Sequence, residues 1–297
     1  MHMARINGKT KLAGVVGNPL GHSLSPAMHN AVYEQLGLDW VYVPLEVKDE
    51  MGLRRFFALA PSLPFVGFNI TMPFKQAAME LCDEVAMAAN MAGAVNAVHV
   101  VDGRLVGYNT DGRGLLEALQ LEASFEPAGK DVVIVGAGGA AGAAFVAFLL
   151  GRAASVTVVN RDPIRADELV ERLRPNLGPV RAASTSTAGA EEAVRTADLI
   201  VNATPAGMRL DDESPIPVEW VGPGQVVYDM VYGRTEPTRL VAGARQHGAT
   251  AIDGLGMLVC QGATAVDIWN DSKQTRTPRE TMRAAAEAAL AARRTEQ

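Results

Sequence analysis

The sequence has few disulfide-forming or metal-binding residues and no long hydrophobic run. It contains two cysteines, Cys82 and Cys260, and five histidines among 297 residues, and neither type shows metal-ligand spacing. Two cysteines in apolar segments are typical of a reducing compartment. No apolar stretch is long enough to span a bilayer, and the N-terminus lacks the apolar core of a signal peptide. We therefore expect a cytoplasmic protein without a metal site.

An excess of positive charge is also missing. The chain has 33 acidic and 27 basic residues and a formal net charge of −6. This balance does not favour binding to nucleic acid or to an anionic membrane, and we expect neither partner. The composition, 48% hydrophobic and 20% charged, is that of a globular protein, and the length suits two domains. The oligomeric state is left open, a homodimer included.

The first third of the chain alternates strand and helix. Apolar runs predict strands at 12–17, 40–47 and 65–71. Between them, one helix is predicted to open at the N-cap Ser25, with proline next, and another to cover 51–60. This alternation favours parallel strands with right-handed crossovers.

The pattern then changes to a hairpin and afterwards to a second α/β unit. Asp102-Gly103 stands between two strand-like runs, which is a strong hairpin signal and makes the first sheet mixed. A helix over 112–121 leads out of this part. Further strands are predicted at 132–135, 155–159, 199–204, 226–230 and 249–253, followed by helices over 256–269 and 281–294.

A glycine-rich turn follows strand 132–135, in the sequence Gly136-Ala137-Gly138-Gly139-Ala140. Gly136 permits a tight turn, Gly138 lets the backbone approach a pyrophosphate, and Ala141 keeps the next helix close to the sheet. A pyrophosphate would lie on the free N–H groups of that helix, where the dipole favours negative charge. The context predicts a dinucleotide site; the simpler alternative is a tight turn without a ligand.

The end of the next strand bears on the choice of dinucleotide. It carries Asn160 and Arg161, with Arg165 one helical turn further on. NAD sites usually have an acidic side chain here, whereas two guanidinium groups can bind a 2′-phosphate, so the pattern predicts NADP. Asp162 leaves NAD open, because its carboxylate could accept a hydrogen bond from a ribose hydroxyl or repel the phosphate. The arginines could also belong to an ordinary solvated helix start.

Lys75 and Asp111 lie just after two strands of the first sheet. The strand from Phe65 is predicted to break at Pro73 into a helix that carries Lys75 near its start. Asp111 comes just before another helix. A lysine and an aspartate at two strand ends can form one proton-transfer pair. The alternative is a surface lysine and a capping aspartate.

Several separated motifs share one order along the chain. They are Ser23-Leu24-Ser25-Pro26, Asn69-Ile70-Thr71-Met72-Pro73-Phe74-Lys75, Ala94-Val95-Asn96-Ala97, Asn109-Thr110-Asp111, the glycine-rich turn, Asn160-Arg161, Asn202-Ala203-Thr204, Asp229-Met230-Val231-Tyr232, and Gly254-Leu255-Gly256-Met257-Leu258-Val259-Cys260-Gln261-Gly262. With these motifs, the sequence resembles the shikimate/quinate dehydrogenase family from about Gly17 to Trp269.

The resemblance implies an oxidoreductase that reduces 3-dehydroshikimate to shikimate with NADPH, on the route to chorismate and the aromatic amino acids. It implies that Lys75 and Asp111 form the catalytic pair and that Ser23 and Ser25 bind the substrate carboxylate. The implied remaining substrate-binding residues are Asn69, Thr71, Asn96, Tyr232 and Gln261. The implied cofactor-binding residues are Gly136, Ala137, Gly138, Gly139, Ala140, Asn160, Arg161, Arg165, Thr204, Met230 and Gly254.

The sequence departs from the family pattern at three places. Asp162 stands where NADP-using members often have threonine or serine, Gly233-Arg234 where Asn-Pro is usual, and Phe74 where histidine is frequent. These departures leave open an NAD-dependent quinate/shikimate dehydrogenase or a relative acting on an amino analogue of shikimate. A non-catalytic dinucleotide sensor is a further alternative, which the presence of both Lys75 and Asp111 disfavours.

The predicted architecture is α/β with two domains. A mixed-sheet substrate domain would comprise residues 1–111 and 255–297, and a Rossmann dinucleotide-binding domain would comprise residues 112–254. The active site is expected in the cleft between them.

Overall fold

The computed structural model describes residues 6–234, 236–271 and 276–295. The fold is α/β, as predicted, with one mixed and one parallel sheet. The chain divides into two compact units, Met1–Thr110 with Val259–Gln297, and Asp111–Leu258. The predicted boundary after residue 111 lies one residue later than the one between the compact units, and the predicted boundary after residue 254 lies four residues earlier.

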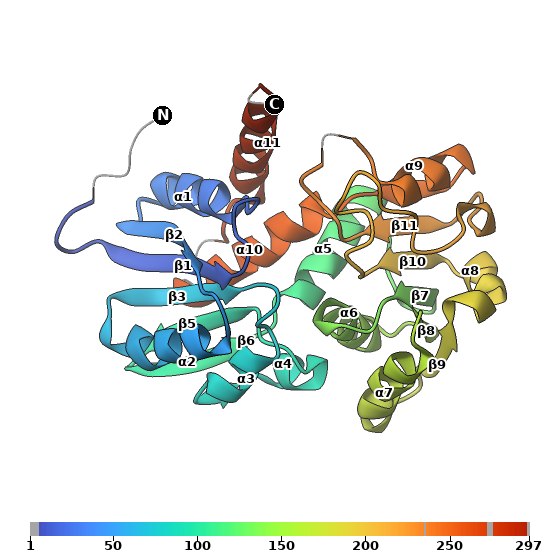
Figure 1. Cartoon of the computed structure of the whole chain (residues 1–297), viewed down its shortest axis with the longest axis horizontal. Coiled ribbons are helices and arrows are strands. Elements are labelled where there is room, and N and C mark those ends of the chain that lie inside the picture. The colour runs from blue at the N-terminus through green and yellow to red at the C-terminus, as the bar shows by residue number, and fades with distance from the viewer. Residues whose placement is uncertain (1–5, 235, 272–275, 296–297) are drawn as a thin grey trace. The chain divides into compact units, whose positions relative to one another are not determined.

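The first unit contains a six-stranded mixed sheet in the order β2-β1-β3-β5-β6-β4 (Figure 1). Only β5 runs antiparallel to its neighbours β3 and β6. Asp102 and Gly103 turn between β5 and β6 with φ of 51° and 72°, the left-handed conformation that Asp-Gly favours, so the hairpin prediction is confirmed. The strands are β1 (Lys11–Gly17), β2 (Trp40–Glu46), β3 (Phe65–Ile70), β4 (Glu84–Val85), β5 (Ala97–Val101) and β6 (Arg104–Tyr108).

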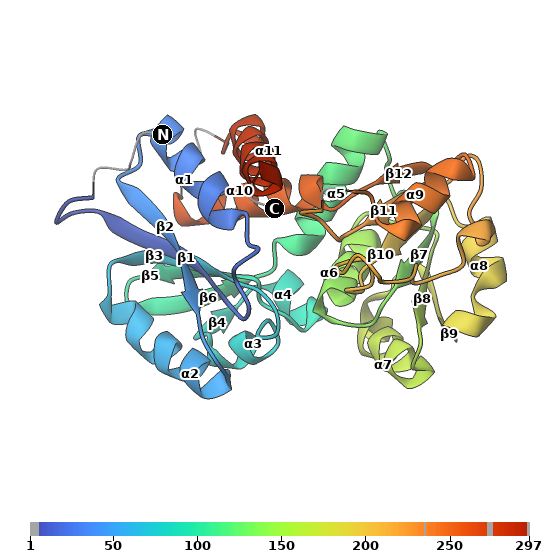
Figure 2. The same ribbon diagram turned by 45° about the horizontal axis from the view of Figure 1, so that its top comes forward.

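Helices cover both faces of this sheet. In both views α1 and α11 lie on one face and α2 and α3 on the other (Figures 1 and 2). Phe56 and Phe57 of α2 pack edge-to-face on Phe68 of β3, which is fully buried. The helices are α1 (Ser25–Leu36), α2 (Glu50–Leu59), α3 (Ala77–Leu81), α4 (Met87–Ala92), α11 (Arg279–Thr295) and the part of α10 (Leu255–Trp269) from Val259 onward, with a 3₁₀ turn at Ala60–Ser62.

The second unit contains a parallel sheet in the order β12-β11-β10-β7-β8-β9. The chain starts at the central β7, moves outward to β9, and returns to the other side with β10, which is the Rossmann order. The strands are β7 (Asp131–Val135), β8 (Ser155–Asn160), β9 (Arg181–Ser186), β10 (Leu199–Asn202), β11 (Val226–Asp229) and β12 (Thr250–Ile252). Ligands of such sheets bind beyond the carboxyl ends of the strands where the order reverses, here between β7 and β10.

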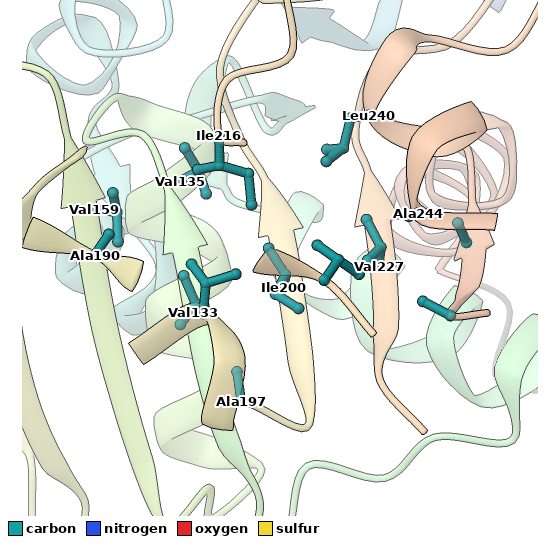
Figure 3. Close-up of a cluster of buried hydrophobic side chains, with 14 of the residues drawn as sticks. Val133, Val135, Val159, Ala190, Ala197, Ile200, Ile216, Val227, Leu240 and Ala244 are labelled. Atoms are coloured by element: carbon teal, nitrogen blue, oxygen red, sulfur yellow. The ribbon is translucent and has the colours of Figure 1, made fainter. Parts of the chain in front are cut away.

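The central strands of the second sheet, β7, β10 and β11, are apolar on both faces. Val133, Ile200 and Val227 from three neighbouring strands belong to one buried cluster, which also contains Leu240 and Ala244 of α9 (Figure 3). The intervening residues, such as Ile134, are also fully buried, as parallel strands between two helical layers require. The helices are α5 (Asp111–Ala123), α6 (Gly139–Leu150), α7 (Pro163–Leu173), α8 (Glu191–Thr196), α9 (Arg239–Gln246) and the start of α10, with 3₁₀ turns at Arg174–Asn176, Thr187–Gly189 and Val218–Trp220.

Candidate active site

Four strand ends meet at one edge of the first sheet. The parallel strands β1, β3 and β6 end there, and the antiparallel β5 begins there. The backbone of Asn96, just before β5, links two of them. Its carbonyl accepts a hydrogen bond of 2.8 Å from the Ile70 N–H, and its own N–H donates to the Tyr108 carbonyl at 3.0 Å. The topology therefore gathers the loops that carry the predicted substrate-binding residues of this unit.

The side chains of Asn96, Thr110 and Gln261 form a buried polar cluster at this edge. Asn96 Nδ2 lies 3.0 Å from Thr110 Oγ1 and 3.3 Å from Gln261 Oε1, and Thr110 Oγ1 lies 3.3 Å from the same glutamine oxygen. All three residues are at most 9% exposed. A hydrogen-bonded cluster of this kind holds its donors and acceptors in fixed directions. Thr110 had no assigned role in the sequence analysis, although it stands within the Asn109-Thr110-Asp111 motif.

The Asn69 side chain is hydrogen-bonded to the backbone of this cluster. Its Oδ1 accepts a 2.8 Å hydrogen bond from the Tyr42 hydroxyl, and its Nδ2 donates to the Asn96 carbonyl at 3.2 Å. Asn69 and Tyr42 are both buried. The bonds of the Asn69 side chain thus hold the backbone of Asn96, and a direct contact between Asn69 and substrate stays a prediction.

Lys75 lies in a turn rather than in a helix, so the predicted helix start at Pro73 is wrong. The Phe74 N–H donates to the Thr71 carbonyl at 3.0 Å, and α3 begins only at Ala77. Phe74 is buried and anchors the turn. The Lys75 carbonyl accepts from the Val95 N–H at 2.8 Å, which ties the turn to the residue beside Asn96. The Lys75 side chain is half-buried, unlike an ordinary surface lysine.

Asp111 is the first residue of α5 and belongs to the second compact unit. It is only 4% exposed, a low value for a carboxylate, which is rarely buried unless it has a partner. It directly follows Thr110, whose N–H donates to Asn96 Oδ1 at 2.7 Å. The chain therefore places Asp111 one residue beyond the buried polar cluster.

Ser23 and Ser25 stand at the start of α1. The prediction that Ser25 is the N-cap is wrong: α1 begins at Ser25 itself, because the first helical hydrogen bond runs from the Met28 N–H to the Leu24 carbonyl. No side chain caps this helix. Ser23 Oγ instead accepts from the Ser25 N–H at 3.3 Å. Thr71, which directly follows β3, is half-buried.

The glycine-rich turn of the second unit lies at the carboxyl end of β7. Gly136 has a φ of 118°, and a Cβ there would come within 3.1 Å of the Ala203 backbone and the Thr204 side chain. Gly138 is the N-cap of α6 and has open space where a Cβ would point. Ala137, Gly139 and Ala140 complete the turn and the first residues of α6. The backbone N–H groups at this helix start suit a pyrophosphate.

At the end of β8 lie the residues expected to select the dinucleotide. Arg161 and Arg165 are exposed, and Asn160 Nδ2 donates to the Asp162 carbonyl at 2.9 Å. Asp162 is the N-cap of α7, where its Oδ1 accepts from the Ile164 N–H at 3.1 Å. A helix cap accounts for this aspartate without a ribose contact.

Thr204, Met230, Tyr232 and Gly254 follow β10, β11 and β12 at the same edge of the second sheet. A Cβ on Gly254 would lie 2.3 Å from the Met230 carbonyl oxygen, so only glycine fits there. Met230 is half-buried and Tyr232 is 38% exposed. Tyr232 lies in the second unit, whereas Asn96, Gln261 and the two serines lie in the first.

A buried polar network fixes the loops that hold these residues. Asn202 donates to Asp229 Oδ1 at 2.8 Å and accepts from the Thr204 N–H at 3.0 Å. Thr238 donates to Asp229 Oδ2 at 2.6 Å. Burial raises the pKa of the Asp229 carboxyl above its usual value, although these hydrogen bonds oppose the shift. Farther out, the Arg234 guanidinium donates to the backbone carbonyl of Arg209 at 2.8 Å.

Comparison with known proteins identifies the family. Residues 15–98 match the family model described as shikimate dehydrogenase substrate binding domain, and residues 119–215 match that described as shikimate / quinate 5-dehydrogenase. A shikimate dehydrogenase (NADP(+)) of Methanopyrus kandleri is 41% identical over 94% of this chain and 96% of its own. The chain belongs to the shikimate dehydrogenase family. A second member, from Rubrobacter xylanophilus, is 45% identical over 91% of this chain and 94% of its own.

Solved structures of the family share the fold. A shikimate 5-dehydrogenase from Thermus thermophilus, in complex with NADP(H) and shikimate, has a TM-score of 0.83 and 36% identity over 94% of this chain and 99% of its own. A quinate dehydrogenase from Corynebacterium glutamicum, in complex with NAD, has a TM-score of 0.84 and 30% identity over 94% and 99%. The family thus includes members named for either substrate.

The described residues contain neither a metal-binding cluster nor a membrane-spanning helix. No group of three or more His, Cys, Asp or Glu residues among them could hold a metal ion. None of the helices in this part of the chain is long and apolar enough to cross a membrane.

Proposed function

We propose that this protein is an NADP-dependent shikimate dehydrogenase, which interconverts 3-dehydroshikimate and shikimate in the cytoplasm, on the route to chorismate. One observation carries the proposal: the chain is 41% to 45% identical to two shikimate dehydrogenases (NADP(+)) over at least 91% of its length. Its own residues provide for the chemistry, since it has a buried polar cluster for ring hydroxyls, a lysine and an aspartate for proton transfer, and a glycine-rich dinucleotide turn.

The substrate is held by the residues of the first sheet edge. Ser23 and Ser25 bind the carboxylate at the start of α1, where the helix dipole favours negative charge. Asn96, Thr71 and Gln261 bind ring hydroxyls. Asn69, which is hydrogen-bonded to the Asn96 carbonyl, and Tyr232 are the remaining substrate-binding residues. Because Asn96 and Gln261 are already hydrogen-bonded to each other, the hydroxyls meet donors and acceptors that are oriented before binding.

Lys75 and Asp111 carry out the proton transfer. When NADPH is bound, it supplies the hydride that turns the ketone carbon into a carbinol carbon. The ketone oxygen gains negative charge in that step and must receive a proton. The Lys75 ammonium stabilises the charge and donates the proton, and the Asp111 carboxylate orients the ammonium. In the reverse direction, Lys75 accepts the proton from the substrate hydroxyl.

The second unit fits NADP. The pyrophosphate binds the N–H groups at Gly138, Gly139 and Ala140, where the open space beside Gly138 leaves room for it. The exposed guanidinium groups of Arg161 and Arg165 bind the 2′-phosphate, and Asn160 lies next to them. Thr204, Met230 and Gly254 lie beside the nicotinamide.

A second candidate function is an NAD-dependent quinate dehydrogenase. The likeness to the Corynebacterium glutamicum quinate dehydrogenase in complex with NAD, together with Asp162, favours it. The capping bond from the Ile164 N–H to Asp162 argues against it, because the aspartate has a structural partner.

Product analysis tests the proposed function. The purified protein is incubated with 3-dehydroshikimate and NADPH, and the products are separated and identified. We expect shikimate and NADP⁺ in equal amounts. Absence of shikimate, with the folded state verified by circular dichroism, would contradict the proposal. Reduction of 3-dehydroquinate at a higher rate would support the second candidate.

A further inference from the structure

The C-terminal helix α11 packs against α1 in the first unit (Figures 1 and 2). Met282 and Ala286, four residues apart on one face of α11, are fully buried. Thr281 of the same helix donates a hydrogen bond to Gln35 at the end of α1. Arg293 lies farther along α11, and its side chain is half-buried.

Arg293 binds the loop that precedes α1. Its Nη1 donates to the His22 carbonyl at 3.1 Å, and its Nη2 donates to the Ser23 carbonyl at 3.2 Å. The two nitrogens of one planar guanidinium thus bind two consecutive carbonyls. Planar, forked donors fix the direction of their acceptors more firmly than a single donor does.

Further hydrogen bonds hold the same loop. The Leu20 N–H donates to Glu46 Oε2 at 2.8 Å, and the Ser23 N–H donates to the Leu20 carbonyl at 2.9 Å. The Ser23 hydroxyl oxygen accepts from the Ser25 N–H. With Arg293 on its carbonyl, Ser23 is held at its N–H, its C=O and its side chain.

We propose that Arg293 is a positioning residue for the binding of the substrate carboxylate. It acts through Ser23, whose backbone it fixes, and it adds a positive charge next to the loop that carries Ser23. Hydroxyl groups alone bind a carboxylate less firmly than a guanidinium does, so a nearby cation strengthens the site for anionic substrates. This inference rests on the proposed function, because the carboxylate is that of shikimate.

A purely structural role for Arg293 makes a different prediction. An arginine in the last turn of a helix is favoured by the helix dipole, and its loss would then lower stability and total activity together. A positioning role predicts instead that substrate binding weakens while cofactor binding and turnover persist.

The test compares Arg293→Gln and Arg293→Lys with wild type and with the control Arg283→Gln. Arg283 lies on the same helix and pairs with Glu287 at 3.6 Å, away from the serine loop. For Arg293→Gln we expect KM for shikimate to rise about tenfold, with KM for NADP⁺ and kcat within about twofold of wild type. Arg293→Lys, which keeps the charge but not the fork, should recover part of the loss. Arg283→Gln should behave as wild type.

Amide hydrogen exchange provides a readout that does not depend on the substrate. In Arg293→Gln the Ser23 N–H should exchange about tenfold faster, while amides of the second sheet stay unchanged. An unchanged shikimate KM, or equal losses in KM, kcat and Tm for the Gln and Lys variants, would overturn the inference. If wild type itself does not oxidise shikimate, the proposed function fails. If, in addition, the Ser23 N–H exchanges equally slowly in wild type and in Arg293→Gln, the proposed effect of Arg293 on the loop is overturned as well.

Discussion

The side-chain oxygen of Asn96 accepts a 2.7 Å hydrogen bond from the backbone N–H of Thr110, the residue immediately before Asp111. The two residues are 14 positions apart and lie at the two ends of the β5–β6 hairpin. This bond fixes the backbone at the point where α5 begins, and it thereby limits the positions that Asp111 can take. Asn96 therefore holds the chain next to Asp111, the residue that we propose as the catalytic aspartate.

Asn96→Ala should impair both stability and substrate binding. The substitution removes the oxygen that accepts from the buried Thr110 N–H and the amide group that donates to Gln261 Oε1. It should therefore lower the free energy of unfolding by about 2–3 kcal/mol. KM for shikimate should rise about tenfold or more. Urea denaturation and initial-rate kinetics measure the two effects, with the exposed Asn90→Ala as control. A stable variant with unchanged KM would refute the role of Asn96.

Lys75→Met should lower kcat by orders of magnitude and leave NADPH affinity nearly unchanged. The methionine keeps most of the side-chain length but can neither stabilise the developing negative charge nor donate a proton. Stopped-flow reduction rates and NADPH fluorescence titration separate the two quantities, and Lys48→Met at an exposed site serves as control. A parallel loss of turnover and NADPH affinity would mean that Lys75 is structural.

Replacing Arg161 and Arg165 together by Gln should raise KM for NADP⁺ at least about tenfold and leave KM for NAD⁺ within about twofold, because only NADP⁺ carries the 2′-phosphate. Arg174→Gln, at the other end of α7, should change neither value.

Asp162→Asn should preserve cofactor preference, since asparagine is an equally good N-cap. A drop in NAD⁺ use by Asp162→Asn would instead assign this carboxylate to the ribose.

His29 should make the protein less stable in mild acid. It is fully buried and stacks on Tyr42 with ring centres 4.0 Å apart, and burial lowers its pKa to about 3. The folded-state pKa lies below the unfolded value of about 6.5, so its stabilising contribution is complete above that pH and is lost as the pH falls toward 3. Between pH 7 and pH 5 the loss from this group is about 2 kcal/mol.

His29→Phe should remove that part of the pH dependence, whatever its stability at neutral pH. Chemical denaturation at both pH values measures the difference, and the exposed His247→Gln should keep the wild-type slope. An equal slope in wild type and His29→Phe would show that His29 does not resist protonation in the folded state.

Much of the fold could be predicted from the sequence because its signals are local. The alternation of apolar runs gives β3 with its start correct and its end one residue late, and Asp102-Gly103 gives the hairpin. The short β4 and the polar β9 were missed, because two residues or a polar strand give no hydrophobic period. The helix predicted from Pro73 failed because the Phe74 N–H bonds back to Thr71, so the chain completes a turn before α3 starts.

The supporting residues of the site could not be predicted in the same way. Arg293 and Ser23 are 270 positions apart, and no local pattern links an arginine in an alanine-rich helix to a serine loop. The bond between Tyr42 and Asn69 likewise depends on the packing of the sheet. Residues expected to touch the ligands came from motifs, whereas residues that hold those motifs in place appeared only with the tertiary structure.

The most direct test of the proposed activity is a steady-state comparison of shikimate and quinate, each with NADP⁺ and NAD⁺, at the nicotinamide absorbance. We predict that, with shikimate, kcat/KM for NADP⁺ exceeds that for NAD⁺ by at least about a hundredfold, given the extra contacts of the 2′-phosphate. With NADP⁺, we predict that kcat/KM for shikimate exceeds that for quinate. A higher kcat/KM for quinate, or for NAD⁺ with either substrate, would contradict the proposed activity.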